Sequence, residues 1–86
     1  MEYVYLVESN LVVGCEKLHS LKVVCKTYDE AKSLFEQEKS IYVEDYVKKL
    51  GWLQTCGNQN SFECFEEGYY QHNNATVSIE KLELVG

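Results

Sequence analysis

The sequence predicts an α+β fold: a small, mainly antiparallel β-sheet of about five or six strands, with one long or broken helix packed on one face. Runs rich in β-branched and aromatic residues lie at both ends of the chain, and one stretch with helical periodicity lies between them. No further helix separates the later strands, so the crossover connections that parallel sheets need are missing. A chain of 86 residues supports one hydrophobic core, which predicts a single domain over residues 1–86.

The N-terminal part predicts strands joined by turns. Residues 3–8 are apolar on both faces, which is typical of a strand inside a sheet. Residues 9–10, Ser-Asn, favour a turn that leads into the apolar residues 11–13. Residues 16–20 are polar, and residues 21–26 are again rich in β-branched residues. We therefore expect the next strand over residues 21–26.

The helix begins at a capping box in residues 27–30, where Thr precedes two acids. Apolar residues then recur at helical spacing up to Gly51, which has the position of a C′ residue. At 100° per residue, however, Ile41 and Val47 lie on different sides of a straight helix. The sequence thus predicts one long helix or one with a break or bend near residues 39–40.

Residues 52–56 and 61–66 predict a hairpin closed by a four-residue loop. This register places Trp52 opposite Phe65 and puts both, with Glu63, on the side away from the core. The core side then carries Leu53, Thr55, Phe62 and Cys64.

The last strand begins at residues 75–79, which alternate between apolar and polar, after a turn in the polar run 71–74. Leu82 and Leu84 are out of phase with this alternation. The phase change predicts a bulge near residues 80–81.

The charge pattern excludes several classes of function. The chain has no arginine, and its eight lysines face fourteen acidic residues, which gives a net charge of −6. Arginine is the preferred residue for gripping phosphate and for stacking on bases, so direct binding of nucleic acid is not expected. The acidic balance favours a protein partner with a basic surface.

The expected location is the cytoplasm. No run approaches the roughly 18 apolar residues that cross a bilayer, and the first residues lack the basic region of a secretion signal. We therefore expect no membrane partner. In a reducing compartment the four cysteines would remain thiols. They are Cys15, Cys25, Cys56 and Cys64.

Metal and thiol chemistry are weakly indicated. Cys15 and His19 are four residues apart, and Cys64 could approach His72 across a turn, but closely spaced pairs of zinc ligands are missing. Cys25 lies near the start of the helix, yet it alternates in phase with apolar residues and should point into the core. The glycines are scattered and form no phosphate-binding loop. We expect no cofactor, no metal and no enzymatic activity.

The candidate partner-binding residues form two groups. The first interleaves carboxylates with aromatic residues, which anchor many interfaces while the acids steer a basic partner. Its members are Trp52, Glu63, Phe65, Glu66, Glu67, Tyr69 and Tyr70. The second is an acidic side of the helix with Glu36, Glu44 and Asp45, although nearby lysines dilute its charge.

These features predict a small acidic protein-binding module. We expect an inhibitor that occupies a basic surface its target normally presents to nucleic acid, a class that includes phage-encoded anti-CRISPR proteins and other nucleic-acid mimics. One alternative is a neutralising protein of the immunity or antitoxin type. Another is a small metal- or thiol-dependent domain that uses the cysteines and histidines. A homodimer formed through an exposed strand edge is also compatible with the sequence.

Overall fold

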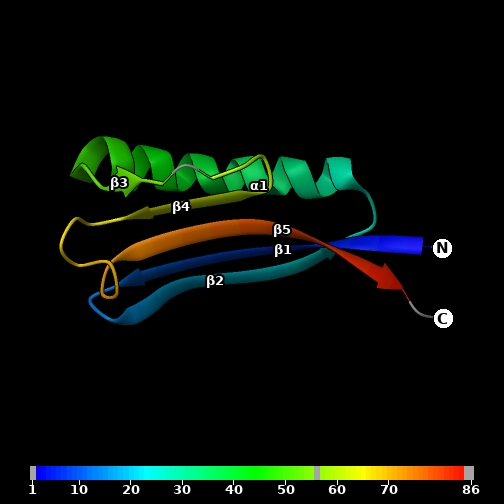
Figure 1. Ribbon diagram of the computed structural model, residues 1–86, viewed down its shortest axis with the longest axis horizontal. Coiled ribbons are helices and arrows are strands. Elements are labelled where there is room, and N and C mark those ends of the chain that lie inside the picture. Colours follow the sequence, from blue (N-terminus) through cyan, green and yellow to red (C-terminus); the bar gives the residue numbers. More distant parts are fainter. Residues whose placement is uncertain (1, 56, 85–86) are drawn as a thin grey trace.

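The computed structural model describes residues 2–55 and 57–84, and within them five antiparallel strands form one sheet in the order β2-β1-β5-β4-β3 (Figure 1). A helical segment lies across one face of this sheet, so the predicted α+β fold is confirmed. The elements are β1 (Glu2–Val13), β2 (Glu16–Cys25), α1 (Tyr28–Tyr42), the π-helical η1 (Val43–Lys48), β3 (Leu53–Gln54), β4 (Ser61–Phe65) and β5 (Asn74–Leu84).

β1 and β2 form a hairpin whose turn lies later than predicted. β1 continues unbroken through residues 9–10, so the turn expected there is wrong. The chain reverses instead at Gly14 and Cys15, whose φ angles of 60° and 68° are those of a two-residue hairpin turn with left-handed backbone. β2 consequently starts at Glu16, within the stretch expected to be polar loop.

A buried polar contact explains why a turn-favouring residue lies inside β1. Ser9 is fully buried, and its Oγ is 2.5 Å from the hydroxyl of Tyr42 at the end of α1. Each hydroxyl satisfies the other in a place that water does not reach. The contact therefore fixes the position of α1 along the sheet.

Replacing Tyr42 with phenylalanine is expected to lower the free energy of unfolding by about 1–3 kcal/mol, because the hydroxyl of Ser9 then has no partner. Urea denaturation measures this change. The double variant Ser9→Ala, Tyr42→Phe should cost less than the sum of the two single variants, since it removes both hydroxyls. Simple additivity would contradict the contact.

The helix starts as predicted and ends through a wider turn. Oγ1 of Thr27 accepts a hydrogen bond from the backbone N–H of Glu30 at 3.2 Å, as an N-cap should. Of the two predicted alternatives, the structure has the long helix, because α1 is continuous through residues 39–40. The phase conflict is resolved because Ile41 is 46% exposed, whereas Val47 in η1 packs on the core. Gly51, with a φ of 74°, takes the predicted C′ position.

The hairpin after Gly51 is shifted by one residue from the predicted register. Leu53 pairs with Phe65, and Gln54 pairs with Cys64. A shift of one residue exchanges the two faces of a strand. Trp52 is therefore buried, with 4% of its surface exposed, whereas Leu53 is 43% exposed. The expected pairing of Cys56 lies outside the described residues.

β5 pairs with β1 along its whole length, from Glu2 opposite Leu84 to Val12 opposite Asn74. The bulge predicted near residues 80–81 is therefore wrong, and an irregularity occurs instead in the pairing of β1 with β2 at Leu11 and Val12. Leu82 and Leu84 are out of phase because they lie on the face of the sheet away from the helix.

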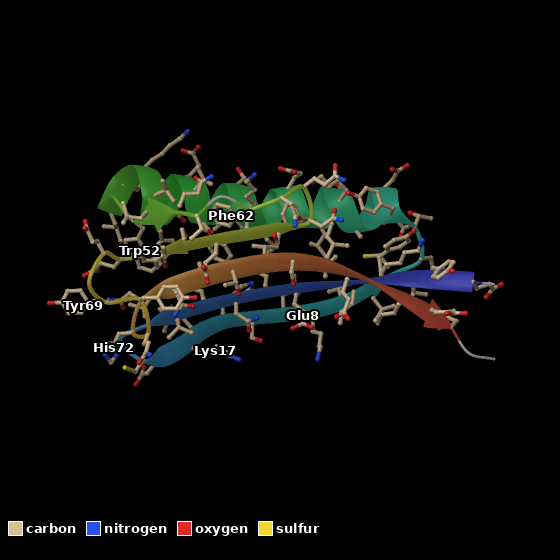
Figure 2. All side chains as sticks on the ribbon, viewed as in Figure 1. Glu8, Lys17, Trp52, Phe62, Tyr69 and His72 are labelled. Atoms are coloured by element: carbon tan, nitrogen blue, oxygen red, sulfur yellow. The ribbon has the colours of Figure 1, made fainter. Side chains whose placement is uncertain are left out.

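The core lies between α1, η1 and the sheet. Trp52 and Phe62 point into this layer, whereas Glu8 points away from the helix (Figure 2). Buried residues of β1 such as Val7 and Leu11 are odd-numbered, so the even-numbered residues line the opposite face. Within residues 2–55 and 57–84, no helix or strand covers that face. The buried hydrophobic residues are Val7, Leu11, Cys25, Ala31, Phe35, Tyr42, Trp52, Phe62, Cys64, Ala75 and Val77.

Candidate protein-binding surface

The candidate surface lies at the end of the sheet where β4 passes into the loop before β5. In β4 the side chains of Phe62 and Cys64 are buried, so those of Glu63 and Phe65 lie on the uncovered face. The loop adds further carboxylates and tyrosines. We call this group the loop-end surface: Glu63, Phe65, Glu66, Glu67, Tyr69 and Tyr70.

Tyr70 joins the aromatic and acidic parts of the loop-end surface. Its ring packs edge-on against Phe65 with 5.1 Å between the ring centres. Its hydroxyl donates a hydrogen bond of 2.7 Å to Oε2 of Glu63. This hydrogen bond and the negative charge of Glu63 raise the pKa of the Tyr70 hydroxyl. The three residues therefore hold one another in place on the sheet surface.

The loop itself is ordered by backbone hydrogen bonds. The N–H of Tyr69 donates to the carbonyl of Glu66 at 2.9 Å, and the N–H of Glu66 donates to the carbonyl of Asn73 at 3.1 Å. Gly68 has a φ of 85°, which is readily adopted only by glycine. This geometry leaves Glu67 exposed and Tyr69 55% exposed, and Tyr69 points away from the sheet (Figure 2). Tyr69 is thus available as an anchor.

Trp52 does not belong to this surface. Its ring packs on that of Tyr46 with centres 4.6 Å apart, inside the core between η1 and the sheet. The prediction that it shares an exposed face with Phe65 is wrong, because the register places it on the other side of the hairpin. A partner cannot reach it in the folded protein.

The three helix acids predicted to bind a partner, Glu36, Glu44 and Asp45, are separate from the loop-end surface, and each is paired with a lysine four residues away. Oε1 of Glu44 lies 2.7 Å from Nζ of Lys48, and Oδ1 of Asp45 lies 3.5 Å from Nζ of Lys49. These exposed pairs neutralise one another locally. Glu44 and Asp45 therefore add little to the negative field of the helix.

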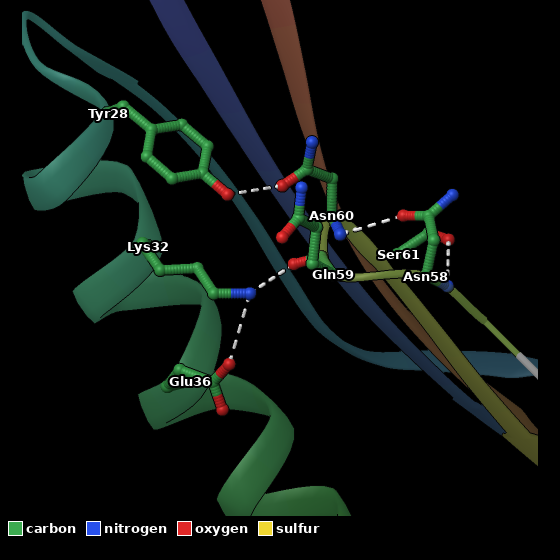
Figure 3. Close-up of polar contacts among 7 residues, drawn as sticks. All are labelled: Tyr28, Lys32, Glu36, Asn58, Gln59, Asn60 and Ser61. Carbon is green, nitrogen blue, oxygen red and sulfur yellow. Dashed lines mark hydrogen bonds and ion pairs between the residues drawn. The ribbon is translucent and has the colours of Figure 1, made fainter.

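Glu36 also has a structural partner. Its carboxylate is 3.2 Å from Nζ of Lys32, and the same Nζ donates to the carbonyl of Gln59 in the loop before β4 (Figure 3). Nearby, the hydroxyl of Tyr28 donates to Oδ1 of Asn60 at 2.7 Å (Figure 3). These contacts tie the first half of α1 to that loop. Glu36 is thus paired with the lysine that contacts the loop.

The carboxylates of the loop-end surface differ from those of the helix. In the described part of the chain, Glu63, Glu66 and Glu67 form no ion pair. Glu63 accepts from Tyr70, and Glu66 accepts from the amide of Asn73 at 3.4 Å. Both partners are neutral, so three negative charges remain uncompensated around two exposed tyrosines.

The cysteines and histidines meet in a different combination from the predicted one. Cys64 is fully buried and Cys25 is 7% exposed, as expected of thiols in a core. Nε2 of His19 lies 2.8 Å from Oε1 of Glu38, while Cys15 contacts His72. Cys15 and His72 are 57 positions apart, so no local spacing could have indicated this contact. Among the described residues no group of three or more metal-binding side chains occurs.

Stability is expected to fall as the pH rises above about 9. Burial raises the pKa of the Cys64 thiol from 9.0 to about 11, and burial also raises the pKa of Tyr42. Above the unfolded pKa the unfolded chain binds fewer protons than the folded one, so the free energy of unfolding decreases with pH. The contribution of the Cys64 thiol to the free energy of unfolding is fully present below pH 9.0 and is lost by about pH 11. The expected loss is up to about 2–3 kcal/mol.

Urea denaturation at intervals between about pH 8 and pH 11 measures this loss. The variant Cys64→Ala, although less stable at the lowest pH, should lose less stability over the same range. A slope equal to that of the unmodified protein would contradict the assignment to Cys64.

Comparison of the chain with known protein families, curated proteins and solved structures finds no match. No helix in the described residues is long and apolar enough to cross a membrane.

Proposed function

We propose that the protein is an acidic binding module that docks its loop-end surface on a basic surface of a partner protein. The observation that supports this proposal is the combination at one site of uncompensated carboxylates and exposed aromatic rings. Aromatic side chains supply contact area with few rotatable bonds, and carboxylates select a basic partner and accelerate its approach.

The proposed partner uses the same basic surface to bind nucleic acid. A surface that binds phosphates does so mainly through the placement of lysine and arginine, and carboxylates at similar positions compete for it. The protein would then act as an inhibitor without a cofactor or a reaction of its own. The absence of arginine from the chain fits this role, because the protein needs no phosphate-binding group.

A capture experiment at two salt concentrations tests the proposal. The tagged protein is exposed to a lysate of its source organism at low salt and at about 1 M salt, where charges more than roughly 3 Å apart are screened. We expect a nucleic-acid-binding protein to be retained at low salt and released at high salt. The captured protein is then purified, and its binding to nucleic acid is measured with and without the module.

Loss of nucleic-acid binding in the presence of the module would support inhibition. Undiminished nucleic-acid binding by the captured protein would reject the inhibitor role. Capture that is equally strong at both salt concentrations would reject the electrostatic mode of docking.

A further inference from the structure

Cys15 and His72 meet at the loop end of the sheet from two separate connections. Sγ of Cys15, in the β1–β2 turn, contacts Nδ1 of His72, in the β4–β5 loop. The backbone N–H of Cys15 also donates to the carbonyl of His72 at 3.1 Å. The neighbouring N–H of Gly14 donates to Oδ1 of Asn73 at 2.8 Å. The main chain thus holds the two loops together where the thiol meets the imidazole.

Cys15 differs from the other cysteines in the described ranges. It is exposed, while Cys25 and Cys64 are buried. A buried thiol with a raised pKa is a poor nucleophile, whereas an exposed thiol beside a proton acceptor is a good one. Nδ1 of His72 is such an acceptor when the neutral imidazole carries its proton on Nε2. Cys15 is therefore the thiol in this part of the chain that a reagent in solution would reach first.

The imidazole also borders an open hollow at the surface of the loop. A pocket of about 380 Å³ lies in the β4–β5 loop, and His72 forms part of its wall. The rest of the lining includes two tyrosines, which offer an apolar surface. The lining residues are Gly68, Tyr69, Tyr70, Gln71 and His72. His72 thus contacts the Cys15 thiol and also forms part of the pocket wall.

We propose that Cys15 and His72 form a thiol–disulfide exchange site for low-molecular-weight disulfides. His72 accepts the proton of the Cys15 thiol, and the thiolate attacks one sulfur of the disulfide. The bond between the two reagent sulfurs breaks as the new bond to Cys15 forms. The electron pair remains on the leaving sulfur, which takes the proton back from the imidazolium. The products are a mixed disulfide at Cys15 and one free small thiol, and the disulfide is the only oxidant.

Reaction with the aromatic disulfide DTNB tests this site. All proteins carry Cys56→Ser, so that the thiol outside the described residues does not contribute. We expect one fast-reacting thiol near neutral pH, and the variant Cys15→Ser should lack it. The variant His72→Gln should slow it at least about tenfold, because the proton acceptor is lost while the backbone hydrogen bonds remain. The matched control His19→Gln should leave the rate unchanged.

A second measurement does not depend on these variants. The protein is incubated with oxidised glutathione, and peptide mass mapping locates the mixed disulfide. Modification at Cys15 ahead of Cys25 and Cys64 is expected, since those two are buried. The proposal is overturned if Cys15 reacts no faster than it does in the urea-unfolded chain, or if His72→Gln and His19→Gln have the same rate. Neither outcome bears on the proposed binding of a basic partner.

Discussion

Replacing Trp52 with alanine is expected to lower the free energy of unfolding by about 3–5 kcal/mol, which is the usual cost of truncating a large buried aromatic side chain. Trp52 is 4% exposed and packs on Tyr46 within the main core cluster. A domain of 86 residues has a total free energy of unfolding of roughly 4–13 kcal/mol. The substitution therefore removes a large fraction of the stability of the fold. Urea denaturation measures the loss. Unfolding is monitored by far-UV circular dichroism, because that signal does not depend on the tryptophan that is removed.

The adjacent residue supplies the control. Leu53 is 43% exposed, and its truncation to alanine should cost no more than about 1 kcal/mol. The register expected from the sequence alone would give the opposite order, with Leu53 in the core and Trp52 outside it. A larger loss for Leu53→Ala than for Trp52→Ala would therefore contradict the hairpin register.

Reversing the charges of Glu63 and Glu66 together is expected to slow association with the basic partner by about tenfold or more at low salt, because electrostatic steering acts mainly on the association rate. The variant Glu63→Lys, Glu66→Lys also replaces the acceptor of the Tyr70 hydrogen bond. The difference from the unmodified protein should shrink as salt is added. Surface plasmon resonance against the captured partner gives both rate constants.

The control for this variant changes the net charge equally at the far end of the sheet. Glu2 and Glu83 are exposed, lie on the paired strands β1 and β5, and are remote from the loops (Figure 1). The variant Glu2→Lys, Glu83→Lys should reduce the association rate much less and should change the free energy of unfolding by no more than about 0.5 kcal/mol. Equal effects of the two variants on association would remove the loop-end surface as the docking site.

Local patterns predicted the parts of the fold that local interactions determine. The N-cap at Thr27, the C′ glycine Gly51 and the interior position of β1 in the sheet follow from backbone chemistry and from residues close in sequence. Ser9 and Trp52 could not be placed in this way. Ser9 is held in a strand by the hydroxyl of Tyr42, 33 positions away, and Trp52 sets the hairpin register through its burial against η1. Both depend on tertiary packing.

The candidate surface was predictable to a similar extent. Alternation within β4 placed Glu63 and Phe65 on one face, and the structure brings Tyr70 to them. The lysines that pair with the helix acids were visible from their spacing. The contact between Cys15 and His72 was not, because it requires the tips of two hairpin connections to meet.

The π-helical turn also makes η1 the place where the length of this chain is most easily adjusted. A wide turn holds more residues than an α-helical one, so the loss of one residue between 43 and 48 can be absorbed by winding the segment more tightly. The same loss within β1 would turn every later side chain of the strand to the other face. Single-residue insertions and deletions in the evolution of this fold should therefore collect in η1 and be excluded from β1.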